Sequence, residues 1–282
     1  MKFKKLTFIL TALFALLSNS SIAKERIISI GGDVTEIIYA LNAEQDLVGR
    51  DSTSLIPEQV KKLPDIGYMR QLNTEGILAL KPTKVITTSV AQPSIVLEQL
   101  KAAGVTVEQV PLQYTTESVV TKIKRIGEIV GKTKQANILT EEFTNKINAI
   151  EKTPLDVKIM FILNRSGSTQ MVAGAGTVAD TAIRLIGAKN AVGNVARFSP
   201  VSQEGVIAAN PDLIVITNLT LKSLGNIDNV WNLPGMAMTN AGQQKAVLVV
   251  DDIAFLAFGL SIPNELQKIR QAAEQVNKSA VK

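Results

Sequence analysis

Residues 64–76, PDIGYMRQLNTEG, place a tyrosine two positions before an arginine in a stretch typical of a turn. Tyr68 is one of three tyrosines among 282 residues, and the chain contains neither histidine nor cysteine. Without those two residue types, the sequence offers no Ser-His-Asp triad, no thiol nucleophile and no ordinary zinc site. The chemistry available to this loop is therefore that of the Tyr68 phenol and the Arg70 guanidinium.

The elements that position this pair follow from alternating strand and helix patterns, which run through the chain twice. Short apolar runs at 26–30 and 157–163 begin the two series. Two later pairs of segments match, TEGILALKPTKVITTS with SQEGVIAANPDLIVITN and DVTEIIYALNAEQDLVG with TVADTAIRLIGAKNAVG. This repeat predicts an α/β protein with two related, Rossmann-like lobes and mostly parallel sheets. In the first lobe, Asp33 is the expected N-cap of a helix, and Glu36 three residues later completes a capping box.

A helical connection is predicted between the lobes. The segments TTESVVTKIKRIGEIVG and KQANILTEEFTNKINAIEK keep the apolar period of an amphipathic helix, and no Gly/Ser-rich or Pro-rich linker separates the lobes. We expect this rigid long α-helix to form a stiff joint. The predicted organisation is a leader at 1–23, an N-terminal lobe at 24–115, a helical spine at 116–153 and a C-terminal lobe at 154–282. The ligand cleft is expected between the lobes.

The first 23 residues have the pattern of a secretory signal peptide. A basic start, MKFKK, precedes an apolar run too short to cross a bilayer, and a small-x-small pattern predicts cleavage after Ala23. No cysteine follows as a lipid attachment site. The leader carries three lysines and no acid, so cleavage lowers the formal net charge of +5 to +2. No clustered basic face indicates nucleic-acid binding. We expect a soluble, exported protein that does not span the membrane.

Over essentially the whole mature chain, the sequence resembles the periplasmic substrate-binding proteins of ABC importers that join two lobes by one long helix. That group binds haem, vitamin B12 and ferric siderophores, and the likeness is greatest to its haem-binding members. The residues that carry it are RIISIGGDVTEIIYAL, LVGRDSTSLIPEQVKKLPDIGYMRQLNTEGILALKP, MVAGAGTVADTAIRLIGAKNAV and SPVSQEGVIAANPDLIVIT. DIGYMRQL is the most specific of these segments, because the equivalent tyrosine of haem-binding relatives is the axial iron ligand.

The resemblance implies that Tyr68 coordinates the iron of ferric haem and that Arg70 hydrogen-bonds the phenolate. Tyrosine is a recognised protein ligand of haem iron. The free phenol has a pKa of about 10, so binding at neutral pH must displace its proton, and a neighbouring cation favours the resulting anion. A guanidinium stays charged and serves that role. The alternative is that Tyr68 is a packing residue and Arg70 a surface charge.

Three further residues are weaker candidates for the haem pocket. Tyr114, just before the helical spine, could face the cleft, and Phe198 in VARFSP could form an apolar wall. Arg165 in LNRSGSTQMVAG is a candidate for contact with a propionate or a second porphyrin. Some haem-binding relatives use a histidine from the second lobe. Its absence here favours a single pentacoordinate ferric haem.

The resemblance also implies a protein partner. In the resembled family, a glutamate at the outer tip of each lobe sits in a pocket of arginines on the membrane permease, so Glu75 and Glu204 are expected to dock there. Charge pairs of this kind set orientation and association rate more than affinity. A purely local role is the alternative, because the dipole of a helix stabilises a carboxylate in its first turn by about 0.3–1 kcal/mol.

The sequence therefore predicts a monomeric periplasmic protein, without enzymatic activity or catalytic cofactor, that captures ferric haem. It is expected to deliver the haem to an inner-membrane ABC permease and ATPase complex, with little closure of the lobes. The nearest alternative is the same fold binding a ferric siderophore or vitamin B12. An alternative from another class is a secreted α/β enzyme, for which the sequence offers no recognisable acid–base pair.

Overall fold

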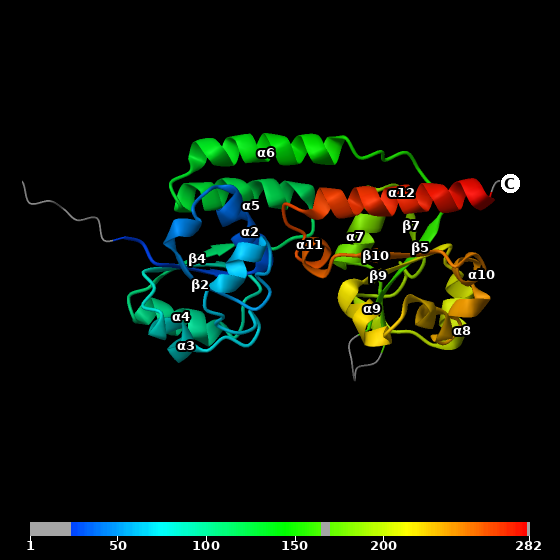
Figure 1. The fold of residues 1–282 in the computed structure, drawn as a ribbon, viewed down its shortest axis with the longest axis horizontal. Helices are drawn as coiled ribbons and strands as arrows, with labels where there is room; N and C mark the ends of the chain where they lie inside the picture. The colour runs from blue at the N-terminus through cyan, green and yellow to red at the C-terminus, as the bar shows by residue number, and fades with distance from the viewer. Residues whose placement is uncertain (1–23, 165–169, 281–282) are drawn as a thin grey trace, which may run out of the picture.

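The computed structural model describes residues 24–164 and 170–280, and two α/β units lie side by side in it (Figure 1). The expected signal peptide with its cleavage site at Ala23, and the candidate residue Arg165, lie outside the described residues. No helix in the described part of the chain is long and apolar enough to span a membrane.

The first unit is built around an all-parallel sheet with the strand order β2-β1-β3-β4. Its central strand β1, IISI, is buried along its whole length, as expected for a strand with both faces covered. The elements of this unit are β1 (Ile27–Ile30), α2 (Gly32–Ala40), η1 (Glu44–Asp46), β2 (Leu47–Arg50), η2 (Glu58–Lys62), α3 (Thr74–Ala79), β3 (Lys84–Thr88), α4 (Ser94–Ala102) and β4 (Thr106–Val110).

The second unit contains a mixed sheet with the strand order β10-β9-β5-β6-β8, to which β7 adds by pairing with β5. Strands β10, β9, β5 and β7 are parallel, whereas the short strands β6 and β8 are antiparallel. Its elements are β5 (Lys158–Leu163), β6 (Met171–Ala173), α7 (Val178–Leu185), β7 (Lys189–Asn190), β8 (Phe198–Pro200), α8 (Gln203–Ala209), β9 (Leu213–Thr217), α9 (Asn218–Leu224), η3 (Ile227–Asn232), η4 (Met236–Met238), α10 (Asn240–Gln244), β10 (Val247–Val250), α11 (Asp252–Leu256) and α12 (Ile262–Ala280).

The predicted fold class, an α/β protein with two mostly parallel sheets, is confirmed. The connection between the sheets is helical, but it consists of two antiparallel helices, α5 (Thr116–Ile129) and α6 (Thr133–Asn148), instead of one long helix. The chain reverses at 130–132, and α6 then crosses above α5 toward the second unit (Figure 1). The two helices pack closely, because a side chain at Gly127 would overlap the Cβ of Ala136.

The capping box expected at Asp33 and Glu36 is wrong, because both side chains make tertiary contacts instead. Helix α2 begins at Gly32 with no side-chain cap. Asp33 forms a buried ion pair with Lys122 of α5. Glu36 accepts hydrogen bonds from the backbone N–H of Leu260, at 3.0 Å, and from the hydroxyl of Ser261, both in the segment that leads into α12.

Glu36 therefore links the two units across 224 residues of chain. The surrounding apolar core is continuous across this link, with buried residues contributed by α2 and α5 on one side and by α7 and α12 on the other. Burial raises the pKa of Glu36, while its hydrogen bonds to Ser261 and Leu260 partly oppose that effect. A shared core and a buried carboxylate link are the physical basis of a stiff joint between the units.

Glu36→Gln is expected to change how stability depends on pH. An acid whose pKa is raised by folding adds stability that is fully present below its unfolded pKa and is lost as the pH rises through the folded pKa. The free energy of unfolding of the wild type should therefore fall, relative to that of the variant, as the pH rises from about 4 to 7. Urea unfolding across this range measures the difference.

Two controls accompany this measurement. Glu141→Gln, at an exposed position on α6, should give a constant offset from the wild type at every pH. Glu36→Ala leaves the Leu260 N–H without its acceptor and should lower stability by about 1–3 kcal/mol. A wild type and Glu36→Gln variant that differ by the same amount at all pH values would contradict the prediction.

Candidate functional site

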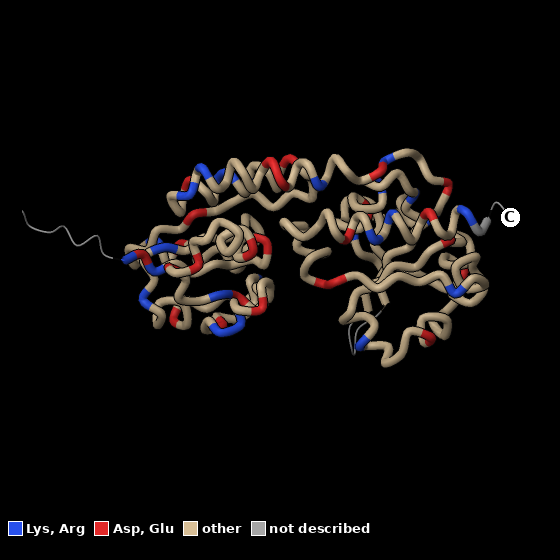
Figure 2. Tube along the Cα trace, turned by 45° about the horizontal axis from the view of Figure 1, so that its top comes forward, with Lys and Arg blue, Asp and Glu red and all other residues tan. Residues whose placement is uncertain are grey.

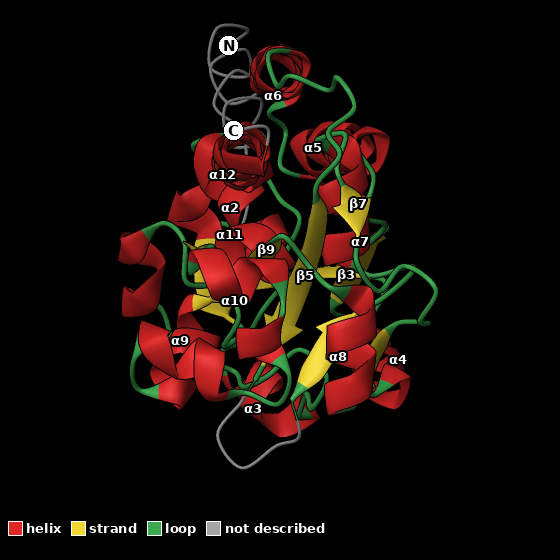
Figure 3. Ribbon diagram, turned by 90° about the vertical axis from the view of Figure 1, so that its right-hand side faces the viewer, coloured by secondary structure: helices red, strands yellow, loops and turns green. Residues whose placement is uncertain are grey.

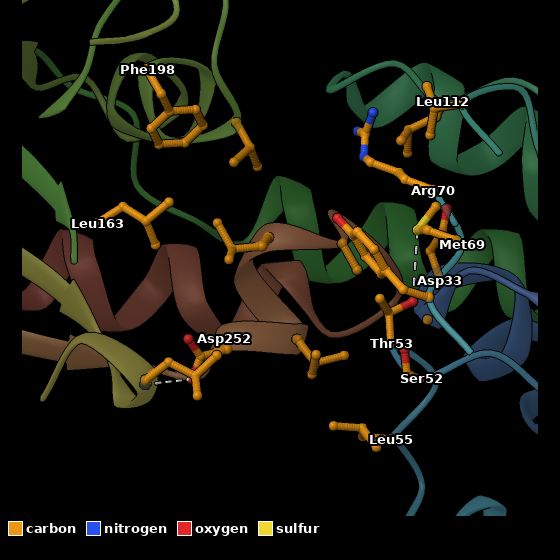
Figure 4. A pocket seen from close by; sticks show the side chains of 18 of the residues that line it. Asp33, Ser52, Thr53, Leu55, Met69, Arg70, Leu112, Leu163, Phe198 and Asp252 are labelled. Carbon is orange, nitrogen blue, oxygen red and sulfur yellow. Dashed lines mark hydrogen bonds between the residues drawn. The ribbon is translucent and has the colours of Figure 1, made fainter. Parts of the chain in front are cut away.

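A cavity of about 1070 Å³ lies between the two units, at the upper end of the range for small-molecule sites. Figure 4 shows Asp33, Thr53, Met69, Arg70 and Leu112 on the side of the first unit and Leu163, Phe198 and Asp252 on the side of the second. The lining also includes Tyr68, Tyr114, Met171, Leu219, Lys222 and Ser223.

Tyr68 lines this cavity from a segment that has no regular secondary structure. The segment is nevertheless braced on both sides by backbone hydrogen bonds. On one side, Ser52 donates to the carbonyl of Gly67 at 2.9 Å; on the other, Gln92 donates to the carbonyl of Met69 at 2.8 Å. The Tyr68 residue remains 37% exposed. The phenol is thus available to a ligand on a loop whose backbone is held in place.

Arg70 lines the same cavity but makes no hydrogen bond to Tyr68 within the described residues. Its guanidinium is exposed and forms no ion pair with any residue of 24–164 or 170–280. Its charge acts on a different phenol, because it lowers the pKa of Tyr114 against the larger effect of burial. Arg70 is therefore a cation of the cavity lining that has no ion-pair partner among the described residues.

Tyr114 is held more firmly than Tyr68. Its ring packs edge-on against the buried Phe258, with centroids 6.0 Å apart. Burial raises the pKa of Tyr114, the charges of Asp33 and Tyr68 raise it further, and Arg70 opposes the shift. The Tyr114 hydroxyl therefore stays protonated more readily than an ordinary phenol, which suits a hydrogen-bond donor better than an anionic metal ligand.

Phe198 forms part of the opposite wall of the cavity. Its ring packs edge-on against Phe161, at 6.4 Å between centroids, and Phe161 in turn stacks on Phe255 at 5.2 Å. Phe161 and Phe255 are buried in the core of the second unit. The wall that faces Tyr68 thus presents an aromatic surface supported from behind by two further rings.

The charged groups of the lining are arranged by sign. The acids are withdrawn, since Asp33 is buried in its ion pair with Lys122, and Asp252 is only 8% exposed and accepts a hydrogen bond from the N–H of Leu219 at 3.0 Å. The cations Arg70 and Lys222 are exposed. Among the residues that the structure describes, neither cation is in an ion pair, so the open part of the cavity carries positive charge.

Lys222 and its neighbours were not found by sequence reasoning. Leu219, Lys222 and Ser223 lie on one face of α9 and line the cavity together. The helix follows β9 directly, at the carboxyl end of a parallel strand, which is where ligands bind in open α/β sheets. That rule, combined with the helical spacing of these three residues, is the signal that identifies them.

Glu75 and Glu204 lie away from the cavity, each in the first turn of a short helix. Asn73 caps α3 and Ser202 caps α8 by accepting hydrogen bonds from Gly76 and Gly205. Both glutamates are exposed, and both helices lie on the side of the molecule opposite α6 (Figures 1 and 3). Hydrogen bonds to its own N–H and to Ser202 lower the pKa of Glu204.

Acidic and basic residues are spread over both units of the described chain (Figure 2). Within the described stretches, no group of three Asp or Glu side chains is placed to hold a metal ion.

Comparisons with known proteins agree with this architecture. Residues 27–254 match the periplasmic binding protein family. The periplasmic heme-binding protein RhuT from Roseiflexus sp. RS-1, solved in its apo form, is 34% identical with a TM-score of 0.86, over 90% of this chain and 100% of that one. The heme-binding protein HutB of Vibrio cholerae is 36% identical with a TM-score of 0.81, over 88% and 98% of the two chains.

A curated relative has a different ligand. The vitamin B12-binding protein of Yersinia pestis is 25% identical over 225 residues, which are 78% of each chain. The named ligands of these relatives therefore differ. The chain belongs to the periplasmic binding protein family and is a non-catalytic, substrate-binding component of an ABC importer.

Proposed function

We propose that this protein captures ferric haem and delivers it to the permease of its ABC importer. The observation that carries the proposal is the exposed phenol of Tyr68, which lines an inter-lobe cavity of about 1070 Å³ from a braced loop. Similarity to periplasmic heme-binding proteins at 34% and 36% identity supports the same ligand. Haem is the cargo in this proposal, and Tyr68 is the axial ligand of its iron.

The remaining lining suits the other parts of a haem molecule. Leu163, Met171 and Phe198 offer apolar contact to a porphyrin face. Arg70 is free to stabilise the Tyr68 phenolate, since a guanidinium stays charged at any physiological pH. Tyr114 is a hydrogen-bond donor at the cavity wall. Arg165 keeps its proposed role at a propionate or a second porphyrin, although it lies outside the described residues.

The charge pattern favours haem over vitamin B12. Haem carries two anionic propionates on an apolar ring, whereas the corrin of B12 is surrounded by neutral amides. In the described lining, Arg70 and Lys222 are exposed and the acids Asp33 and Asp252 are buried. An accessible surface of this sign attracts carboxylates. Vitamin B12 remains the second candidate ligand because a B12-binding relative covers 78% of the chain.

The delivery step completes the proposal. We propose export by the leader with cleavage after Ala23, lobes at 24–115 and 154–282 with a helical spine at 116–153, and docking of Glu75 and Glu204 to an inner-membrane permease. The shared core and the Glu36 link favour small lobe movement on haem binding. The permease then has to separate the lobes to release the cargo.

Titration of the mature protein with hemin, beside a Tyr68→Phe variant, tests the ligand. The wild type should show a saturable Soret shift and a high-spin ferric tyrosinate charge-transfer band. The variant should lack the band and bind hemin at least about tenfold more weakly, because an axial iron–oxygen bond is lost. Tyr39→Phe is the matched control and should behave as the wild type. Identical spectra for wild type and Tyr68→Phe, with saturable binding of cyanocobalamin, would assign the site to vitamin B12.

Lys222→Gln should weaken hemin binding by about 1.4-fold to fivefold, because an exposed charge pair contributes roughly 0.2–1 kcal/mol. The reason is the loss of a cation opposite a propionate. Hemin dimethyl ester, in which both propionates are neutral, should bind wild type and Lys222→Gln equally. Fluorescence quenching titrations with the two ligands form a double comparison. An equal loss of affinity for both ligands would contradict the charge argument.

Replacing Glu75 and Glu204 with glutamine should impair delivery while leaving hemin binding unchanged. The two carboxylates lie on exposed helix starts away from the cavity, so the variant loses only the charges proposed to orient docking. Association with the permease in nanodiscs should slow by about tenfold at low ionic strength and by less at high salt. Glu98→Gln and Glu141→Gln, at exposed positions on other helices, serve as the control pair.

A further inference from the structure

The segment that carries Tyr68 is fixed by a carboxylate outside the cavity lining. One carboxylate oxygen of Asp65 accepts a hydrogen bond from the backbone N–H of Gly67 at 2.8 Å. The other oxygen pairs with the guanidinium of Arg50 at 2.9 Å. Asp65 thus joins the last residue of strand β2 to the residue immediately before Tyr68.

Arg50 provides a rigid anchor for this carboxylate. Its side chain is only 10% exposed, and its Nη1 atom also donates to the carbonyl of Asp51 at 3.1 Å. The Nε atom is buried and has no hydrogen-bond partner among the described residues. The Arg50 guanidinium has few alternative partners in this position. Its charge is therefore balanced by Asp65, and the ion pair fixes the orientation of the Asp65 carboxylate.

The second partner of Asp65, Gly67, has an unusual backbone conformation. Gly67 has φ +93°, a region that other residues rarely adopt, and nothing lies within 4 Å of the place a Cβ would occupy. The glycine is therefore required by backbone conformation and not by space. The adjoining Cα belongs to Tyr68, so the angle at Gly67 sets the direction in which the phenol enters the cavity.

We propose that the Arg50–Asp65 pair positions Tyr68 for its ligand by holding Gly67 in this conformation. Asp65 is a positioning residue, since it acts through Gly67 and does not line the cavity. Backbone hydrogen bonds support the same segment, from Ser52 to Gly67, from Gln92 to Met69, and between Arg50 and residues 64 and 66. Among these contacts, only the Asp65 carboxylate joins the Arg50 guanidinium to the N–H of Gly67. The effect of Asp65 on iron binding by Tyr68 rests on the proposed function.

The first test needs no haem, because the chain has only three tyrosines. Protein labelled with 3-fluorotyrosine should give three ¹⁹F resonances, and Tyr68→Phe assigns one of them. Asp65→Asn should shift or broaden the Tyr68 resonance and leave that of Tyr39 unchanged. Glu58→Gln, which removes the exposed partner of Lys61 in the same unit, is the matched control and should leave all resonances in place.

Gly67→Ala keeps the test decisive if Asp65→Asn folds poorly. Its added methyl group meets no neighbour, so only the backbone conformation is disfavoured, and the Tyr68 resonance should move here as well. A Tyr68 resonance that is unchanged in a folded Asp65→Asn variant, or in Gly67→Ala, overturns the proposal. So does a Tyr39 resonance that moves as much as that of Tyr68, since the effect would then be general loosening of the unit.

The second test measures the ligand. Asp65→Asn should release hemin about fivefold to tenfold faster than the wild type and shift the tyrosinate charge-transfer band, whereas Glu58→Gln should do neither. A wild type that shows no such band contradicts the proposed function, and the fluorine spectra still decide whether Asp65 positions Tyr68. A wild-type band that Asp65→Asn reproduces, with an unchanged release rate, overturns the positioning role for haem.

Discussion

The contact between α2 and the segment leading into α12 sets the separation of the two lobes, and the cavity depends on it. Glu36 receives two hydrogen bonds from that segment, and a side chain at Gly259 would come within 2.7 Å of the Glu36 carboxylate. One turn earlier on α2, the buried Asp33–Lys122 ion pair fixes α2 against α5. These contacts, part-buried at Glu36 and buried at Asp33, favour a cleft of constant width.

The cavity lining combines aromatic side chains that are packed against the core with polar side chains that are exposed. The aromatic wall behind Phe198 and the ring pair of Tyr114 with Phe258 are extensions of the core. The exposed, polar part of the lining consists of Tyr68 and Arg70, from a loop of the first unit, and Lys222, from the last turn of α9 in the second. A planar, apolar ligand with an anionic rim, as proposed for this site, would meet both kinds of surface at once.

The organisation into two α/β units could be predicted because the strand and helix pattern repeats, and periodicity survives without knowledge of tertiary contacts. The contacts of Asp33 and Glu36 could not be predicted from this pattern. Their spacing is that of a local cap, yet both carboxylates are used over long range, by Lys122 and by Ser261. Tyr68 is a candidate by residue type and by resemblance, whereas Lys222 becomes a candidate only once α9 is placed at the carboxyl end of the parallel strand β9.

Each sheet is assembled from a continuous piece of chain, with strands within 27–110 for the first and 158–250 for the second. The pairings inside each sheet are therefore comparatively local, but the Glu36 link closes a loop of more than two hundred residues. Loop closure over such a span comes late, since its entropic cost is recovered only when the other contacts exist. By this argument the Glu36 link forms after the sheets, and a chain truncated before residue 260 would lose both hydrogen-bond partners of Glu36 together with the buried face of α12 that packs on β9 and β10.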